Sequence, residues 1–238
     1  MQHYFGSVQN GLVILPEEEV HHLLHVKRAE LGEEIEVGDG EDVFRCRVDS
    51  LDPLRLSVLG QAVSPRELSV AVTLAFGTLK GDHNEFIVQK GTELGVSSFV
   101  PFLSARTVVR PKDPEDGKLI RLRRVAQESA KQCRRGKIPS VSPYCSFSSL
   151  LARNEAVKLF AYESDALKGV SLWETLKGRD LSSVLIVIGP EGGFSDGEAK
   201  SLKDAGFLPV SLGKRILRAE TAALYCASVV SAYVEGKE

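Results

Sequence analysis

The sequence predicts an α/β protein in which a small N-terminal β-barrel precedes a C-terminal domain with a parallel sheet. Three observations support this fold class. Residues 184–188 form a continuous apolar run rich in β-branched side chains, which is typical of a strand buried on both faces of a parallel sheet. Beyond residue 69, strand-like and helix-like segments alternate, as they do in α/β domains. Residues 1–61 are instead mainly β-like.

The N-terminal domain is predicted to cover residues 1–64. A short helix is expected at 16–27, where Val20, Leu23 and Leu24 lie at helical spacing. Turn signals then separate short β-like runs, which is the pattern of a small barrel. The expected strands are 34–37, 43–48 and 54–59.

The second domain is predicted to cover residues 69–238, after a linker at 63–67. Ser195 stands three residues before Glu198, which is the spacing of a capping box, and Gly206 is a typical residue after a helix end. General rules of chain topology favour an unknotted, doubly wound sheet. The expected strands are 70–76, 99–102, 157–161, 184–188 and 209–212, and the expected helices are 84–94, 118–135, 172–176, 195–205 and 221–234.

Two glycine-bearing loops follow the strands 184–188 and 209–212. The first contains Gly189, Gly192 and Gly193, which lack a Cβ and let main chain lie against a ligand, although a tight turn without a ligand has the same composition. The second begins at Gly213. Ligands of open α/β sheets collect at the carboxyl ends of strands, so we expect the loops to face one another across a cleft. Neither loop has GxGxxG or GxxxxGK[ST] spacing, which disfavours a nucleotide hydrolase.

Composition excludes several other classes. The chain has 238 residues, and 43% of them are hydrophobic, but no stretch approaches the ~20 apolar residues of a membrane span. The start, MQHYFGSVQN, lacks the features of a signal peptide, so a cytoplasmic location is the expectation. The four cysteines include no CxxC pair. His21 and His25 are expected to meet on one helix face, but two imidazoles alone make a poor metal site, and we predict no metal.

Charge is distributed unevenly along the chain. Residues 1–64 hold 5 Lys and Arg against 12 Asp and Glu, a net charge of −7, whereas residues 106–137 hold 11 against 4, a net charge of +7. A basic segment in a protein of net charge −2 marks where phosphate groups are tolerated. The alternative interpretation is a solvated helix face.

The two glycine loops carry a resemblance to a known family. LIVIGPEGGFSDGEA and LGKRILRAETAAL resemble the cofactor loops of SPOUT methyltransferases, in particular the ribosomal RNA small subunit methyltransferase E family. This resemblance implies a trefoil-knotted catalytic domain, a PUA-like RNA-binding N-terminal domain and a homodimer. It also implies transfer of a methyl group from S-adenosyl-L-methionine to N3 of a uridine in 16S ribosomal RNA.

Further segments are similar to the same family and imply RNA contacts. The stretch KGDHNEFIVQKGTELGV resembles the family pattern KGDRMEWIIQKATELGV, but His83 replaces the commoner arginine. QESAKQCRR resembles the segment EAAEQSGR, with Lys131 where an acid is usual, and Arg28 matches an arginine that precedes the barrel strands. The candidate RNA-binding residues are Arg28, Lys80, Gln89, Lys90, Glu93, Arg106, Gln132 and Arg135.

Methyl transfer to a uracil nitrogen sets the chemical requirements. The donor and N3 must be aligned, the imide proton must leave, and the developing negative charge must be balanced. Glu220 is the candidate base, with Arg218 or Arg215 as the stabiliser; Glu220 also suits the first turn of a helix without any catalytic role. The candidate cofactor-binding residues are Glu163, Ile188, Gly189, Glu191, Gly192, Gly193, Leu212, Gly213, Ile216, Leu217, Arg218 and Ala222.

Two other functions stay open at this point. The chain could be a related SPOUT methyltransferase that acts on another RNA position. It could also be a non-catalytic RNA-binding or ribosome-assembly factor that keeps the pocket. The helix 221–234 likewise fits either a subunit interface or the core of its own subunit.

Overall fold

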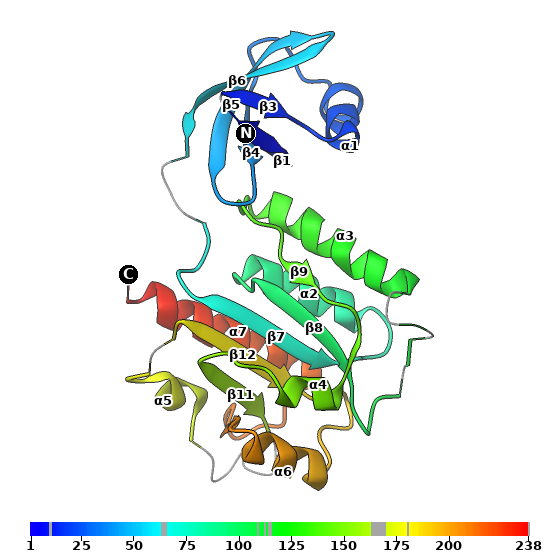
Figure 1. Cartoon of the computed structure of the whole chain (residues 1–238), viewed down its shortest axis with the longest axis vertical. Coiled ribbons are helices and arrows are strands. Elements are labelled where there is room, and N and C mark those ends of the chain that lie inside the picture. The colour runs from blue at the N-terminus through cyan, green and yellow to red at the C-terminus, as the bar shows by residue number, and fades with distance from the viewer. Residues whose placement is uncertain are drawn as a thin grey trace. The chain divides into compact units, whose positions relative to one another are not determined.

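The computed structural model describes residues 1–9, 11–62, 66–108, 110–111, 113, 116–162, 170–179 and 181–237. The chain forms two compact units (Figure 1). The first contains Met1–Glu67 and Ala130–Ile138, and the second contains Leu68–Ser129 and Pro139–Glu238. The domain limits 1–64 and 69–238 stay predictions. No pattern in the sequence indicated that 130–138 would pack with the N-terminal segment.

The first unit is built on a mixed sheet of six strands in the order β1-β4-β5-β6-β3-β2, curved into a half-barrel. β1 pairs with β4 in parallel, and the other pairs are antiparallel. Tyr4, Leu23, Ile35 and Cys46 fill its core. The strands are β1 (Gln2–Phe5), β2 (Ser7–Gln9), β3 (Leu12–Ile14), β4 (Glu34–Gly38), β5 (Val43–Leu51) and β6 (Leu54–Gln61).

The sequence predicted the barrel character of this unit but not all of its elements. The strands β1, β2 and β3 were not predicted individually, because each has only three or four residues. The single helix expected at 16–27 is α1 (Glu17–His21) continued by a π-helical turn, η1 (His22–Val26). His21 and His25 do meet, with ring centroids 5.0 Å apart.

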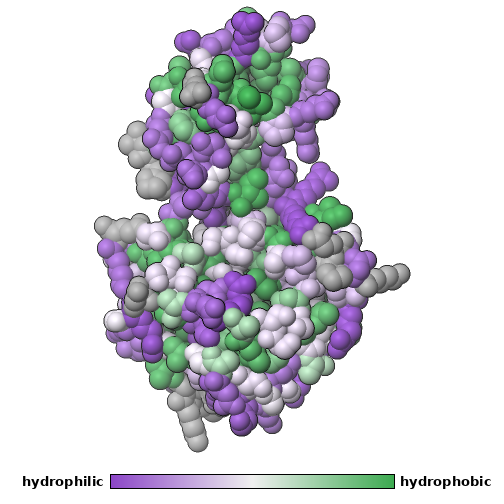
Figure 2. All heavy atoms as spheres, viewed as in Figure 1, coloured by the Kyte–Doolittle hydropathy of each residue, from purple (hydrophilic) through white to green (hydrophobic). Residues whose placement is uncertain are grey.

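Several large apolar side chains of the first unit are exposed. Leu12 and Ile14 on β3 are 67% and 63% exposed, and Leu31 in the loop after η1 is 66% exposed. Figure 2 shows apolar residues among polar ones on the visible face of this unit. The surface of this unit is therefore partly apolar despite its many acidic residues.

The second unit is an α/β fold, as predicted. Within the described residues its strands are all parallel, in the order β10-β8-β7-β12-β11-β13, and β9 also pairs with β8. β12 lies between β7 and β11, so the apolar run 184–188 lies in a central strand, as predicted. The strands are β7 (Ala71–Gly77), β8 (Ser98–Leu103), β9 (Ser140–Val141), β10 (Cys145–Ser146), β11 (Val157–Ala161), β12 (Ser183–Ile188) and β13 (Leu208–Val210).

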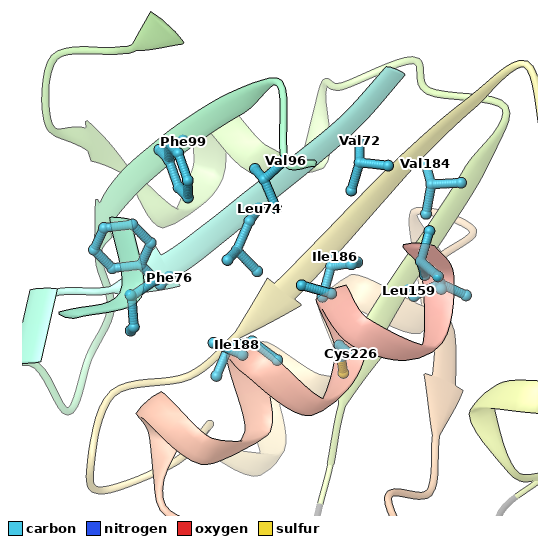
Figure 3. Close-up of a cluster of buried hydrophobic side chains, with 14 of the residues drawn as sticks. Val72, Leu74, Phe76, Val96, Phe99, Leu159, Val184, Ile186, Ile188 and Cys226 are labelled. Atoms are coloured by element: carbon cyan, nitrogen blue, oxygen red, sulfur yellow. The ribbon is translucent and has the colours of Figure 1, made fainter. Parts of the chain in front are cut away.

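Helices cover both faces of this sheet. Leu74, Ile186 and Ile188 point to one face and pack with Cys226 of α7 in a cluster that also includes residues of α2, α3 and α5 (Figure 3). Leu185 and Val187 point to the other face, towards residues of α4 and α6. The helices are α2 (His83–Glu93), α3 (Gly117–Gln132), α4 (Phe147–Leu151), α5 (Leu172–Leu176), α6 (Asp196–Asp204) and α7 (Ala219–Glu235).

Most predicted elements of the second unit are confirmed to within a few residues. β9, β10 and α4 were not predicted. Among the described residues, no helix combines the length and apolar character that crossing a membrane requires. The trefoil knot stays a prediction from the resemblance.

Candidate active site

The carboxyl ends of five parallel strands open onto one cavity of about 700 Å³. Its lining comes from the segments that follow β7, β8, β11, β12 and β13. Such a volume suits a ligand of drug size. The predicted convergence of the two glycine loops at this edge of the sheet is confirmed.

The first glycine loop is a tight turn directly after β12. The amide of Gly193 donates a hydrogen bond of 2.8 Å to the carbonyl of Pro190, and Gly193 has a φ of +65°. Ser195 then caps α6, and the capping box with Glu198 is present in both directions, with Ser195 N donating to Glu198 Oε2 at 2.9 Å and Glu198 N donating to Ser195 Oγ at 3.2 Å. The loop is thus held between a buried strand and a helix with a capped N-terminus.

Three long-range hydrogen bonds fix this loop and the start of α6 to neighbouring strand ends. The amide of Lys80, after β7, donates to Glu191 Oε1 at 2.8 Å. Arg106 Nη1, after β8, donates to the carbonyl of Gly192 at 2.8 Å. The amide of Ala105 donates to Glu198 Oε1, also at 2.8 Å. The main chain around Gly192 is therefore pre-organised against the cavity.

The second glycine loop, after β13, supplies the opposite wall. Gly213 has a φ of +104°, a conformation that a residue with a side chain rarely adopts, and a Cβ at this position would meet no atom within 4 Å. Ile216 is 79% exposed although it is apolar, and Leu212 and Leu217 are half-buried. This wall therefore offers apolar surface to a ligand.

The predicted cofactor-binding residues come together at this cavity, except Glu163, which lies outside the described residues. The others line the cavity: Ile188, Gly189, Glu191, Gly192, Gly193, Leu212, Gly213, Ile216, Leu217, Arg218 and Ala222.

The candidate catalytic residues also line this cavity. Glu220 lies in the first turn of α7, with its side chain 15% exposed, and its Oε1 is 3.7 Å from Nδ1 of His83 at the start of α2. Arg215 and Arg218 lie on the same wall, and Arg218 is the residue before α7. One glutamate and two arginines thus line the same cavity, a set of residues that suits proton removal and stabilisation of negative charge.

The candidate RNA-binding residues are dispersed. Lys80 and Arg106 line the cavity. Gln89 and Glu93 are exposed on α2, and Lys90 forms an ion pair of 2.8 Å with Glu93. Gln132 is exposed at the end of α3, and Arg28 is exposed in the first unit with a φ of +55°. Their contact with RNA stays a prediction.

Arg135 differs from the expectation of an open basic rim. Its side chain is only 4% exposed, and its Nη2 is 2.5 Å from Glu67 Oε2. In the same unit, Lys131 Nζ lies 2.7 Å from Glu19 Oε1. Part of the basic segment therefore neutralises acids of the first unit, which the charge count alone did not reveal.

The remaining buried charges of the first unit form a compact group. The bidentate guanidinium of Arg66, at 2.8 and 2.9 Å, holds the pKa of the Glu36 carboxyl below its usual range. His3 Nδ1 lies 3.5 Å from the same carboxylate, yet burial lowers the pKa of His3. No group of three metal-binding side chains occurs among the described residues.

Sequence reasoning missed several residues of the cavity. Tyr162 donates a hydrogen bond of 2.9 Å to Asp196 Oδ1, and both line the wall. Position 83 had no assigned role, yet His83 stands beside Glu220. Tyr162 directly follows β11, so its place at a carboxyl strand end was an available signal. No sequence signal indicated the contact between His83 and Glu220, because 137 positions separate them in the chain.

Comparison with known proteins places this fold and cavity in a class of enzymes. A family model described as RNA methyltransferase domain matches residues 66–231, and one described as RNA methyltransferase PUA domain matches residues 15–58. The chain is 38% identical over 231 residues to ribosomal RNA small subunit methyltransferase E of Bacillus subtilis, covering 92% of this chain and 89% of the relative. It is 33% identical to the protein of that name from Synechocystis, covering 96% and 76%. The chain belongs to the ribosomal RNA small subunit methyltransferase E family.

Solved structures agree with this placement. The Neisseria gonorrhoeae ribosomal RNA small subunit methyltransferase E bound to S-adenosyl methionine superposes with a TM-score of 0.84 at 28% identity, covering 98% of this chain and 96% of that one. A putative methyltransferase from Legionella pneumophila in complex with the same cofactor gives a TM-score of 0.82, also at 28% identity and with the same coverage. The resemblance inferred from the glycine loops is confirmed.

Proposed function

We propose that this protein transfers a methyl group from S-adenosyl-L-methionine to N3 of a uridine in 16S ribosomal RNA. The observation that supports this most strongly is the cavity in which two glycine loops, an apolar wall and the Glu220 carboxylate face one another. Family membership supports the reaction class, and two similar structures hold this cofactor.

The residues present fit S-adenosyl-L-methionine. Ile188, Leu212, Leu217 and Ala222 provide apolar surface for an adenine ring, and the Gly189–Gly193 loop provides main chain for the polar groups. When bound, the cofactor supplies an electrophilic methyl group on a sulfonium. The chain's own task is to hold the target nitrogen in line with that methyl group.

Glu220 accepts the imide proton of the target uracil in this proposal. The N3–H bond breaks, the proton passes to a carboxylate oxygen of Glu220, and the freed electron pair of N3 forms the bond to the methyl carbon while the bond from that carbon to sulfur breaks. Arg215 and Arg218, which lie on the same wall, balance the negative charge that develops on the uracil oxygens. No step requires a metal ion.

The RNA approaches the open side of the cavity. Lys80 and Arg106 line it, and exposed basic residues of α3 such as Arg121 and Arg124 belong to the same unit. Such a surface attracts phosphate groups without reading sequence. The PUA-domain match and the exposed Arg28 support a further RNA contact by the first unit.

Primer extension on ribosomal RNA tests the proposal. A methyl group on N3 blocks the Watson–Crick edge, so 16S RNA from a strain without the gene should lose one reverse-transcriptase stop. The wild-type gene should restore the stop, and E220Q, produced at an equal level, should not. A stop that persists in the deletion strain, or that E220Q restores fully, would argue for another RNA position or for a non-catalytic assembly factor.

A homodimer is part of the proposal. α7 buries one face in its own subunit but leaves Thr221, Tyr225, Ser228 and Ala232 exposed, with Tyr225 at 44%. A face of small residues around one aromatic ring suits packing against a second copy. Light scattering coupled to gel filtration should give twice the chain mass of 25.9 kDa, and the variant Y225E should give the single mass.

A further inference from the structure

The cavity lining contains a histidine–carboxylate contact that the sequence pattern did not assign. Nδ1 of His83 lies 3.7 Å from Oε1 of Glu220, and both residues line the cavity. The His83 side chain is 43% exposed, whereas the Glu220 side chain is 15% exposed. The imidazole therefore lies on the solvent side of a carboxylate that is largely enclosed.

We propose that His83 is a positioning residue that holds the Glu220 carboxylate towards the target base. The inference rests on the proposed function, because it gives His83 a role through Glu220. A carboxylate that must meet one proton of a bound base needs a fixed direction, and a neighbouring side chain restricts its rotation. His83 itself does not contact the substrate in this proposal.

The local structure keeps His83 in place. It is the first residue of α2, and the following residue, Asn84, is buried and bonded to both main-chain groups of Leu79 at 2.9 and 3.0 Å. α2 packs on α7, which carries Glu220. The packing of the two helices therefore places the imidazole beside the Glu220 carboxylate.

Other charged groups surround the pair. On its own helix, His83 follows Asp82, and Glu85 forms an ion pair of 2.9 Å with Arg121. From α7, the titratable groups nearest to the start of the helix are Glu220 and Tyr225. The remaining charged residues of the cavity lining are Lys80, Arg106, Glu191, Asp196, Arg215 and Arg218.

Two substitutions separate the effect of a fixed cation from that of a neutral side chain at this position, because a guanidinium group stays charged and an amide carries no charge. The variant H83R keeps a cation beside Glu220 throughout, and H83Q never has one.

The test compares kcat and KM of the wild type, H83R and H83Q on the RNA substrate. H83Q should lower kcat by on the order of tenfold and leave KM unchanged, because only the direction of the Glu220 carboxylate is disturbed. H83R should restore most of the lost kcat. A kcat of H83Q equal to that of the wild type, or an H83R variant no faster than H83Q, would overturn the proposal.

A double variant and a binding measurement distinguish an effect of His83 through Glu220 from an effect on cofactor binding. In the E220Q background, H83Q should have no further effect on kcat, because the group that it positions is already gone. Calorimetric binding of S-adenosylhomocysteine should stay unchanged in H83R and H83Q. If the wild type transferred no methyl group to RNA at all, the proposed function would fail. Equal kcat values for an active wild type and H83Q refute only the role of His83.

Discussion

The guanidinium of Arg106 donates a hydrogen bond of 2.8 Å to the carbonyl oxygen of Gly192, joining the loop after β8 to the glycine loop after β12. A Cβ built on Gly192 would lie 3.2 Å from the Cβ of Arg106, so the side chain packs directly on the glycine. The same arginine lines the cavity and lies in the basic segment that we expect to face RNA. One residue therefore connects the cofactor loop with the RNA-facing side of the cavity.

Replacing Arg106 by alanine should weaken cofactor binding as well as RNA binding. A hydrogen bond from a charged donor stabilises by about 1.5–3 kcal/mol, and the exposure of Arg106 places the effect at the lower end, or about tenfold in Kd. Calorimetry with S-adenosylhomocysteine measures it. The matched control is R124A, which removes an exposed arginine of α3 outside the cavity lining. An equal cofactor Kd in both variants would contradict the connection.

Gly213 and Gly197 should respond in opposite ways to alanine. Gly213 has a φ of +104°, so G213A strains the loop by about 1–2 kcal/mol and should shift it away from the ligand. Gly197 lies in α6, where an added methyl group would meet only open space, so G197A should raise the free energy of unfolding by up to about 1 kcal/mol. Denaturant unfolding and cofactor titration of both variants check this. Equal changes in unfolding free energy and in cofactor affinity for the two variants would mean that the positive φ of Gly213 does not restrict the choice of residue there.

Glu198 should contribute more to stability than its cap partner Ser195. Its carboxylate accepts hydrogen bonds from the amides of Ser195 and Ala105. Among the described residues, the Ser195 hydroxyl bonds only to Glu198, accepting from its amide and donating to its carboxylate. We expect E198A to lower the free energy of unfolding by about 2–3 kcal/mol and S195A by about 1 kcal/mol. Urea denaturation measures both values. The reverse order would show that the link between the β8 and β12 loops carries little energy.

The first unit should lose stability in mild acid. Burial lowers the pKa of His3, so the folded state binds fewer protons than the unfolded state, and stability present above about pH 6.5 declines as the pH falls below it. The pKa of Glu36, lowered by Arg66, adds a loss of the same sign below about pH 4.5. Unfolding at a series of pH values should show a shallower decline for H3F than for the wild type. A decline of the same slope in H3F would assign the acid sensitivity to other groups.

Local patterns were enough to predict the frame of the site. The apolar run 184–188 and the Ser195 capping box indicated a buried strand, a loop and a helix start, and the structure has each of them. Because parallel strands end at one edge, two glycine loops after such strands were expected to converge, and they do. These features depend on residues close together in the chain.

The rest depends on contacts between distant residues. Arg106 and Gly192 are 86 positions apart, and nothing in either segment indicates the other. The strands β9 and β10 have two residues each, which is too short for a periodic signal. Likewise, only the structure shows that Lys131 and Arg135 pair with acids of the first unit. A charge count cannot distinguish such pairs from a free basic surface.

A crystal structure of the protein with S-adenosylhomocysteine and a short uridine-containing RNA would show whether the cavity holds both ligands. We expect the cofactor between the Gly189–Gly193 loop and the loop that begins at Gly213, with a uracil N3 within hydrogen-bond distance of Glu220. A cofactor bound elsewhere, or a uracil whose N3 points away from Glu220, would contradict it.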